Sequence, residues 1–237
     1  MENDRPRKRP FINRSNLRDI IIVISVLSAM FYGLDNVRLC LSFFLLCFGC
    51  FFHYVTKGVL IRNVVLCREG TYSLVRHPYY MANYLIDSSF CLLSGNVYLI
   101  LIYPFVFYWS YGNTIRKEES LLASVHGEEF LKYSLDVPQI FPDAYSIRNM
   151  REIIKGFSHQ RITRNEVSRF MRFWATGLFI VFVHSIKNEF LAELNNLIFL
   201  RDHHRESVLL FTAIILFVAS LFIRCKQESA PPAPQPK

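Results

Sequence analysis

Long apolar runs are the feature that most limits what this chain can fold into. Six runs that are nearly free of charged residues recur along its 237 residues: 20–34, 39–55, 79–93, 97–111, 173–186 and 208–223. A bilayer core about 30 Å thick needs ~20 mostly apolar residues per helix, so these runs predict membrane spans. Several runs are short for a full crossing, which leaves room for a re-entrant one. We expect an all-α fold, a polytopic membrane helical bundle with about six transmembrane helices.

Short polar links join the first four runs in pairs. Residues 35–38 separate the first two runs, and Ser94-Gly95-Asn96 separates the third from the fourth. Gly and Asn favour a tight reversal of the chain. The sequence therefore predicts two helical hairpins, followed after a long polar interval by a further pair of helices.

The distribution of basic residues predicts how these helices are oriented. Cytoplasmic loops retain Lys and Arg, and with the N-terminus inside, all but four of the 27 basic residues fall in cytoplasmic segments. We expect a multi-pass integral protein of a bacterial inner membrane or the endoplasmic reticulum, with both termini cytoplasmic and basic residues on anionic headgroups. Nucleic acid is not an expected partner, because no soluble basic domain is visible.

These patterns divide the chain into six predicted parts. They are a basic cytoplasmic N-terminal segment at 1–19, a transmembrane hairpin at 20–55, a core with the second hairpin at 56–145, a basic segment at 146–172, a transmembrane pair at 173–223 and a disordered tail at 224–237. Apolar residues at helical spacing in the basic segment are compatible with an amphipathic helix on the membrane surface, although the basic residues by themselves favour the alternative. A plain basic linker that only determines topology is the alternative.

The turn before the third run carries the first candidate site residues. Pro78 restricts His77 and starts the next helix, so Arg76 and His77 are expected in an extended turn at the membrane surface. The guanidinium fork and the positive end of a helix both favour an anionic ligand. In the alternative interpretation, Arg76 extends to lipid headgroups while His77 and Tyr80 are interface anchors.

An acidic pair follows the fourth run. Glu118 and Glu119 point about 100° apart on a helix, so we expect one to face the protein and the other solvent. Gly127 is the expected end of this helix. A charged helix leaving a membrane is often only a solvated face. However, an antiparallel hairpin brings this pair and the Arg76-His77 turn to the same bilayer surface, where they can share a pocket.

Other chemistry has weaker support in the sequence. Cys47 and Cys50 form a C-x-x-C inside an apolar helix and are expected to be buried small hydrophobic residues, and His203 and His204 have no evident co-ligands, so no metal site is predicted. The nine glycines form no Gly-x-Gly, so a Rossmann-type nucleotide loop is not expected.

The central motifs together resemble a known family. The chain reads Gly70-x-Tyr-x-x-Val-Arg-His-Pro-x-Tyr80, then Glu118-Glu-x-x-Leu122, Gly127-x-x-Phe-x-x-Tyr133 and Val137-Pro-x-x-x-Pro142. This order resembles the isoprenylcysteine carboxyl methyltransferase family and its phospholipid methyltransferase relatives, over about a third of the chain. The resemblance implies a methyltransferase that holds S-adenosylmethionine at the cytosolic mouth of the helices. It also implies a lipid or lipidated acceptor that enters from the bilayer.

The resemblance also implies which residues form the site. The catalytic candidates are Arg76, Glu118 and Glu119, and the cofactor-binding candidates are Tyr72, Leu74, Val75, Arg76, His77, Pro78, Tyr80, Glu118 and Glu119. The side chains and amides of Arg76 and His77 would bind the cofactor's carboxylate, Tyr80 would pack on its adenine or ribose, and a glutamate would accept hydrogen bonds from its amino or hydroxyl groups. Glu119 or His126 would serve as a base only for an amine acceptor.

Two positions depart from the family pattern, and the acceptor stays open. Ala82 stands where the family has Gly, and Thr114 stands where an Arg is common, with Arg116 and Lys117 nearby. The acceptor could be a prenylated cysteine, an amine headgroup or a lipid phosphate. The competing functions are an NADPH-dependent sterol-reductase-like enzyme and a non-catalytic lipid-binding relative.

Overall fold

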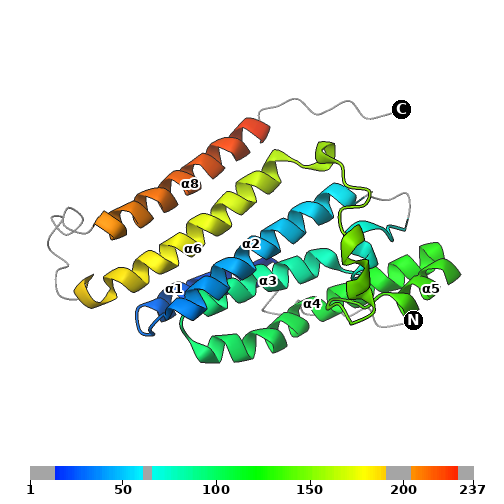
Figure 1. Ribbon diagram of the computed structural model, residues 1–237, viewed down its shortest axis with the longest axis horizontal. Coiled ribbons are helices and arrows are strands. Elements are labelled where there is room, and N and C mark those ends of the chain that lie inside the picture. The colour runs from blue at the N-terminus through cyan, green and yellow to red at the C-terminus, as the bar shows by residue number, and fades with distance from the viewer. Residues whose placement is uncertain (1–13, 61–65, 191–203, 229–237) are drawn as a thin grey trace, which may run out of the picture.

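The predicted all-α architecture is confirmed. The computed structural model describes residues 14–60, 66–190 and 204–228, which form helices and no strand (Figure 1). The α-helices are α1 (Arg14–Ala29), α2 (Asn36–Val59), α3 (Pro78–Leu93), α4 (Val97–His126), α5 (Glu128–Asp136), α6 (Arg164–Phe190) and α8 (His204–Glu228). Three short 3₁₀ helices are η1 (Gly70–Ser73), η2 (Ser146–Glu152) and η3 (His159–Arg161).

Each of the six predicted apolar runs overlaps one long helix. Within the described residues, three helical segments combine the length and hydropathy needed to cross a bilayer: Asn36–Val59, Arg164–Lys187 and His204–Arg224. By contrast, α1 and α3 have 16 residues each, fewer than a straight crossing needs. The number of crossings therefore stays a prediction. Residues 1–13, His203 and the tail beyond 228 lie outside the described residues.

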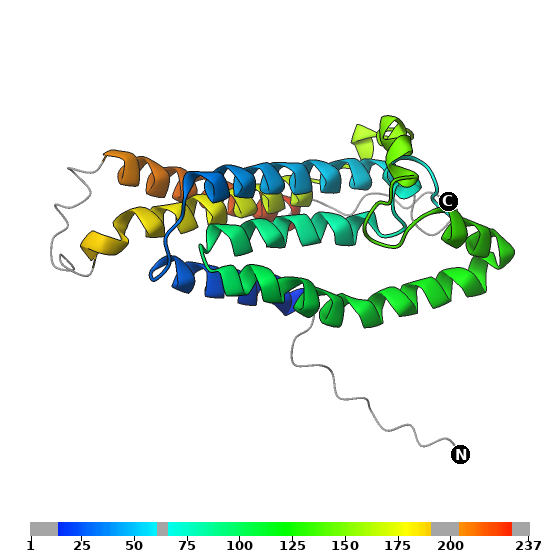
Figure 2. The ribbon, with the colours of Figure 1, turned by 60° about the horizontal axis from the view of Figure 1, so that its bottom comes forward.

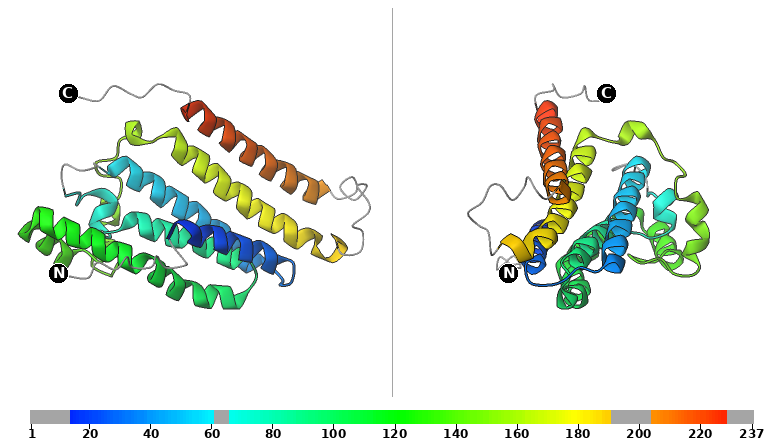
Figure 3. Two further views of the ribbon diagram at one scale, coloured as in Figure 1. Left: turned by 180° about the vertical axis from the view of Figure 1, so that it is seen from behind. Right: turned by 60° about the vertical axis from the view of Figure 1, so that its left-hand side comes forward.

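The long helices lie roughly side by side, with α8 at the edge of the bundle (Figures 1 and 3). α8 packs mainly on α6, and large apolar side chains such as Phe211, Ile215 and Phe222 are exposed on it. On the other side of the molecule α4 bows along α3 and continues toward α5 (Figure 2). Exposed apolar residues on the outer helices are expected where lipid replaces water.

Small residues bring α2 and α3 into close contact. A Cβ atom on Gly49 of α2 would lie 2.8 Å from Cγ1 of Ile86 and 3.2 Å from the carbonyl oxygen of Ala82 on α3. Ala82 is fully buried at this contact. Alanine at this position therefore still permits the close packing that a glycine would allow, and the N-terminus of α3 is held firmly against α2.

The predicted α3–α4 hairpin is confirmed at its turn. Gly95 has φ +70°, and the Asn96 side chain caps α4 by accepting a hydrogen bond of 3.0 Å from the Tyr98 amide. Inside the hairpin, the buried Asp87 carboxylate accepts hydrogen bonds from the Tyr103 hydroxyl on α4 and the Arg18 guanidinium on α1. These polar contacts tie α1, α3 and α4 together and so align the ends of α3 and α4.

Helix α4 is long and uninterrupted. It runs through Pro104 for 30 residues, which is about 45 Å at 1.5 Å per residue, and ends at Gly127 as the sequence predicts. Gly127 has φ +52°, a conformation that favours glycine, and α5 starts directly after it. The acidic pair lies on the last third of α4.

Of the two alternatives for the basic segment at 146–172, a single amphipathic helix is not what the structure shows. The segment contains η2, η3 and the start of α6, because tertiary contacts fold it over the end of α2. A Cβ atom on Gly58 would lie 2.2 Å from the ring of Phe157, and the Arg161 guanidinium donates to the carbonyls of Gly58 (2.9 Å) and Val59 (3.0 Å). These contacts satisfy terminal carbonyls of α2.

Substitution of Gly95 by Ala is expected to destabilise the hairpin. The added Cβ would lie 2.5 Å from the Gly33 carbonyl oxygen at a positive φ, so we expect a loss of about 1–3 kcal/mol in the free energy of unfolding. Thermal unfolding in detergent measures the effect. Gly112→Ala is the matched control, since its Cβ would meet nothing closer than 3.9 Å inside α4 and should be neutral or stabilising. Equal melting temperatures for both variants would contradict the expectation.

Candidate active site

The turn before α3 has the predicted non-helical geometry. His77 has φ −119° and ψ 65°, and Pro78 takes the first position of α3. Leu74 and Val75 are buried in the main hydrophobic core, so they anchor the turn from beneath. The side chains of Arg76 and His77 are thereby directed toward the end of α4.

The segment after α5 runs alongside this turn and pairs with its backbone. The Arg76 amide donates to the carbonyl of Pro138 at 2.8 Å, and the His77 amide donates to the carbonyl of Gln139 at 2.9 Å. The expectation that these two amides bind a ligand is therefore wrong. A ligand can meet only the side chains of Arg76 and His77.

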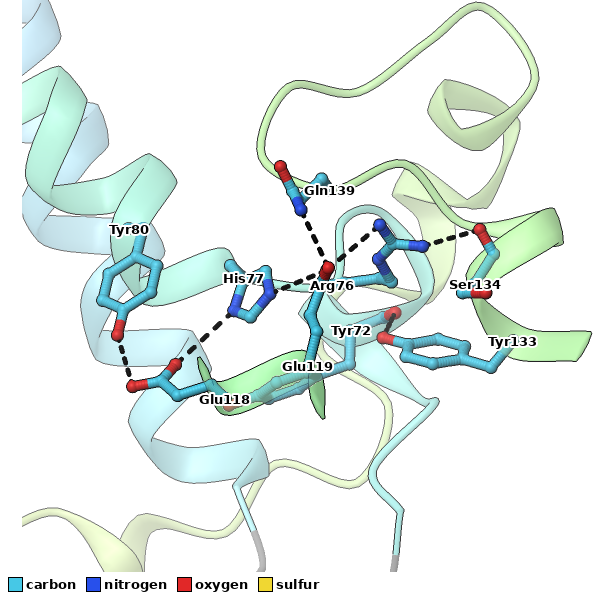
Figure 4. Close-up of polar contacts among 9 residues, drawn as sticks. All are labelled: Tyr72, Arg76, His77, Tyr80, Glu118, Glu119, Tyr133, Ser134 and Gln139. Atoms are coloured by element: carbon cyan, nitrogen blue, oxygen red, sulfur yellow. Dashed lines mark hydrogen bonds and ion pairs between the residues drawn. The ribbon is translucent and has the colours of Figure 1, made fainter. Parts of the chain in front are cut away.

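Glu119 is the centre of a polar cluster that joins three segments (Figure 4). Its Oε1 lies 3.0 Å from Nη2 of Arg76 and 3.1 Å from Nε2 of His77. Its Oε2 accepts a hydrogen bond of 2.9 Å from Nε2 of Gln139. The Glu119 side chain is only 20% exposed, so these contacts replace most of its water.

Glu118 joins the same cluster from its other side. Its Oε1 accepts a hydrogen bond of 2.5 Å from the Tyr80 hydroxyl, and its Oε2 lies 3.8 Å from Nδ1 of His77 (Figure 4). The expectation that only one carboxylate faces the protein is wrong, because the two nitrogens of His77 meet the two glutamates. Glu118 nevertheless remains 43% exposed, more than the 20% of Glu119.

His77 is buried between these groups and stacks on the Tyr80 ring with centroids 5.4 Å apart. Burial lowers the pKa of His77, and this effect exceeds the opposite pull of Glu119 and Glu118. The imidazole is therefore neutral at neutral pH, with a single N–H. The shorter distance to Glu119 favours the proton on Nε2.

Arg76 has donors in addition to those that Glu119 uses. Its Nη1 donates to the Ser134 carbonyl at 2.6 Å, while its Nε is buried and has no hydrogen-bond partner among the described residues. A buried unsatisfied donor is uncommon in folded proteins. It marks a position that an acceptor group of a ligand can fill.

Residues that sequence reasoning missed come from the segment around α5. Ser134 and Gln139 contact the charged cluster directly, and the Tyr133 hydroxyl donates to the Tyr72 carbonyl at 2.7 Å (Figure 4). Burial raises the pKa of both tyrosines, which keeps their phenols protonated. The only signal for this segment was its Tyr133 and Val137-Pro138 motif, which does not specify contacts.

The donor and acceptor set fits a zwitterionic nucleoside-like ligand. Arg76 supplies a cation for a carboxylate, the partly exposed Glu118 supplies a carboxylate acceptor for hydroxyl or amino groups, and Tyr80 supplies an aromatic face. The charged side chains satisfy one another in this structure, so a carboxylate that binds Arg76 must compete with Glu119. Within the described ranges, no group of three or more His, Cys, Asp or Glu side chains could hold a metal ion.

The basic residues near Thr114 do not complete the cluster. The Arg116 guanidinium donates to the Asn113 side chain at 2.6 Å and is exposed, as is Lys117. His126 lies seven residues beyond Glu119, about 10 Å further along α4. Arg116 therefore does not substitute for an arginine at position 114 within the site.

Comparison with known proteins gives one distant relationship. No family model and no solved structure matches the chain. It is 27% identical over 91 residues to protein-S-isoprenylcysteine O-methyltransferase of Schizosaccharomyces pombe. The match covers 38% of this chain and 39% of that relative, about two fifths of its length. Together with the apolar helices, this similarity suggests a membrane protein and, at family level only, a methyltransferase.

Substitution of Glu119 by Gln is expected to weaken the packing of α4 against the turn. The change removes the negative charge that Arg76 faces in a shielded place, so we expect a loss of about 1–3 kcal/mol in the free energy of unfolding. Thermal unfolding in detergent measures it. Glu129→Gln is the control, because that carboxylate is 57% exposed at 2.9 Å from Arg68 and should cost less than about 1 kcal/mol. A larger loss at Glu129 would contradict the central role of Glu119.

Proposed function

We propose that this protein is an S-adenosylmethionine-dependent methyltransferase whose acceptor is a lipid or lipidated molecule in the bilayer. The observation that carries the proposal is the cluster of Arg76, His77, Glu118 and Glu119 between the start of α3 and the last third of α4. The distant methyltransferase relative and the apolar helices support it independently.

The charges of the cluster match the parts of the cofactor. The side chain of Arg76 would hold its carboxylate, because Arg76 Nε is a donor without a partner in the described chain, and the single N–H of His77 could join only by leaving Glu119. Glu118 would accept hydrogen bonds from amino or hydroxyl groups, and Tyr80 would pack against the adenine or ribose. The cofactor, when bound, supplies an activated methyl group on a cationic sulfur. The nearby carboxylates of Glu118 and Glu119 would favour this cationic sulfur at short range.

The protein's part in the reaction is mainly alignment. Methyl transfer is an in-line displacement, so the site must bring donor and acceptor to near-attack separation. A carboxylate or phosphate acceptor is already nucleophilic at neutral pH, whereas an ammonium headgroup must first lose a proton. In the amine case Glu119 is better placed than His126, because it belongs to the cluster itself.

The site's position also suits a membrane substrate. In the orientation predicted from charge, the start of α3 and the end of α4 lie at the cytoplasmic surface, where a soluble cofactor is available. A lipid acceptor would reach the same level from the inner leaflet. Both termini would then be cytoplasmic.

Binding of S-adenosylhomocysteine tests the cofactor assignment. We expect detergent-purified protein to bind it, and Arg76→Ala and Glu118→Gln to weaken binding roughly tenfold or more, since hydrogen bonds to charged groups contribute about 1.5–3 kcal/mol. Isothermal titration measures the affinity, and circular dichroism checks that the helices persist. Arg148→Ala is the control, because Arg148 also lies on the predicted cytoplasmic side. The affinity of this variant for S-adenosylhomocysteine should not change.

The same titration separates the competing functions. Unchanged affinity in both site variants would refute the assignment of these residues. Binding of NADPH in place of S-adenosylhomocysteine would identify a reductase-like enzyme. A folded protein that binds neither would be a non-catalytic relative, the outcome that the absence of an arginine at position 114 favours.

A labelling experiment addresses the acceptor. We expect membranes that contain the protein to transfer methyl label from the cofactor into a lipid or lipidated fraction, and Arg76→Ala to abolish the transfer. Release of the label by mild base indicates a methyl ester, whereas stable label indicates an amine. Label confined to water-soluble products would contradict a bilayer acceptor.

A further inference from the structure

Helices α6 and α8 carry a second charged cluster outside the candidate active site. Its centre is Glu166, which is only 6% exposed. Glu166 lies 3.1 Å from Arg169 Nη1, 3.9 Å from Lys57 Nζ and 3.8 Å from His53 Nδ1. One buried carboxylate therefore faces two cations, Lys57 on α2 and Arg169 on α6, and cannot balance both.

Two further arginines extend this cluster toward α8. Arg172 is near enough to Arg169 and Arg224 to experience their positive charges. Its Nη1 donates to the Ser168 hydroxyl at 3.2 Å, a neutral group, and no carboxylate of the described chain lies within 4 Å of it. The Arg172 guanidinium therefore faces like charges and a neutral hydroxyl, which favours an external anion.

The packing of α6 and α8 keeps these arginines together. The Ser168 hydroxyl donates to the Ser220 carbonyl at 2.8 Å, and both serines are buried where the helices meet. Arg172 follows Ser168 by one turn, and Arg224 follows Ser220 by one turn on the antiparallel partner. The two residues therefore lie on opposite sides of this contact, and both lean back toward it because helical side chains tilt toward the N-terminus, as the hydrogen bond from Arg172 to Ser168 shows.

The surroundings of the arginines match an amphiphile. The start of α6 and the ends of α2 and α8 lie at the same end of the bundle as the start of α3 (Figure 1). Next to Arg224 on α8, the apolar side chains of Val218, Leu221 and Phe222 are exposed. A phosphate at the arginines would place attached acyl chains along this apolar surface, whereas free phosphate would leave it uncovered.

We propose that Arg172 and Arg224, with Arg169 beside them, form a binding site for the phosphate group of an anionic membrane lipid. The planar guanidinium forks match phosphate geometry. The site is independent of the methyl-transfer proposal, since it shares no residue with the candidate active site. Each basic group near an anionic lipid surface strengthens binding roughly fivefold.

Native mass spectrometry of the full chain, with added phosphatidylglycerol or phosphatidylcholine, tests the site. We expect tighter binding of phosphatidylglycerol, and a loss of roughly tenfold or more in its affinity for Arg172→Gln combined with Arg224→Gln. The affinity for phosphatidylcholine should change little. Arg224→Gln alone should lower the phosphatidylglycerol affinity severalfold. Because Arg224 is exposed, this single variant keeps the test valid if the double variant does not fold.

Arg148→Gln combined with Arg151→Gln is the matched control, because it removes the same charge from η2. Unchanged phosphatidylglycerol affinity in this control supports a specific site. An equal loss in both double variants would show that net charge alone determines the affinity, and would overturn the proposed site. Displacement of phosphatidylglycerol by an equal concentration of inorganic phosphate would identify a free-phosphate site and also overturn the lipid assignment.

Discussion

The shared carboxylate of Glu119 holds the candidate site together. It joins the turn before α3, the last third of α4 and the segment after α5 through Arg76, His77 and Gln139. Without it, two donors that are largely shielded from water would lack their acceptor, which is costly. The side chain of the neighbouring Glu118 is more exposed, at 43% against 20%. Two adjacent residues of the same type thus have different surroundings, and Glu118 is the more accessible of the two.

Local chemistry made much of the fold predictable. Gly95 and Asn96 at the hairpin, Pro78 at the start of α3 and Gly127 at the end of α4 act through their own backbone preferences, and each lies where the sequence placed it. The meeting of Arg76 with the acidic pair was also predictable, because a tight hairpin brings the ends of its two helices together. The number of crossings and the roles of the site residues stay predictions.

Contacts between distant segments were not predictable. The carbonyls of Pro138 and Gln139 accept hydrogen bonds from the two backbone amides that were expected to bind a ligand. Phe157 packs over Gly58 instead of continuing a surface helix. Both depend on which segment packs beside which, and a single sequence carries no period or motif for that. Of the apolar residues between 147 and 157, Ile153 and Phe157 are partly buried, Phe157 against Gly58 of α2, whereas Ile147, Met150 and Ile154 are exposed.

The uninterrupted length of α4 couples the site to the bilayer. At about 45 Å the helix exceeds a hydrocarbon thickness of about 30 Å, so the part that carries the acidic pair would project beyond the lipid. Glu118 lies 14 residues past Pro104, about 21 Å along the axis, so a tilt of about 5° at the proline would displace it by about 2 Å. That displacement exceeds the tolerance of a hydrogen bond. Hydrophobic mismatch in a thinner or thicker membrane would therefore act directly on the geometry of the acidic pair.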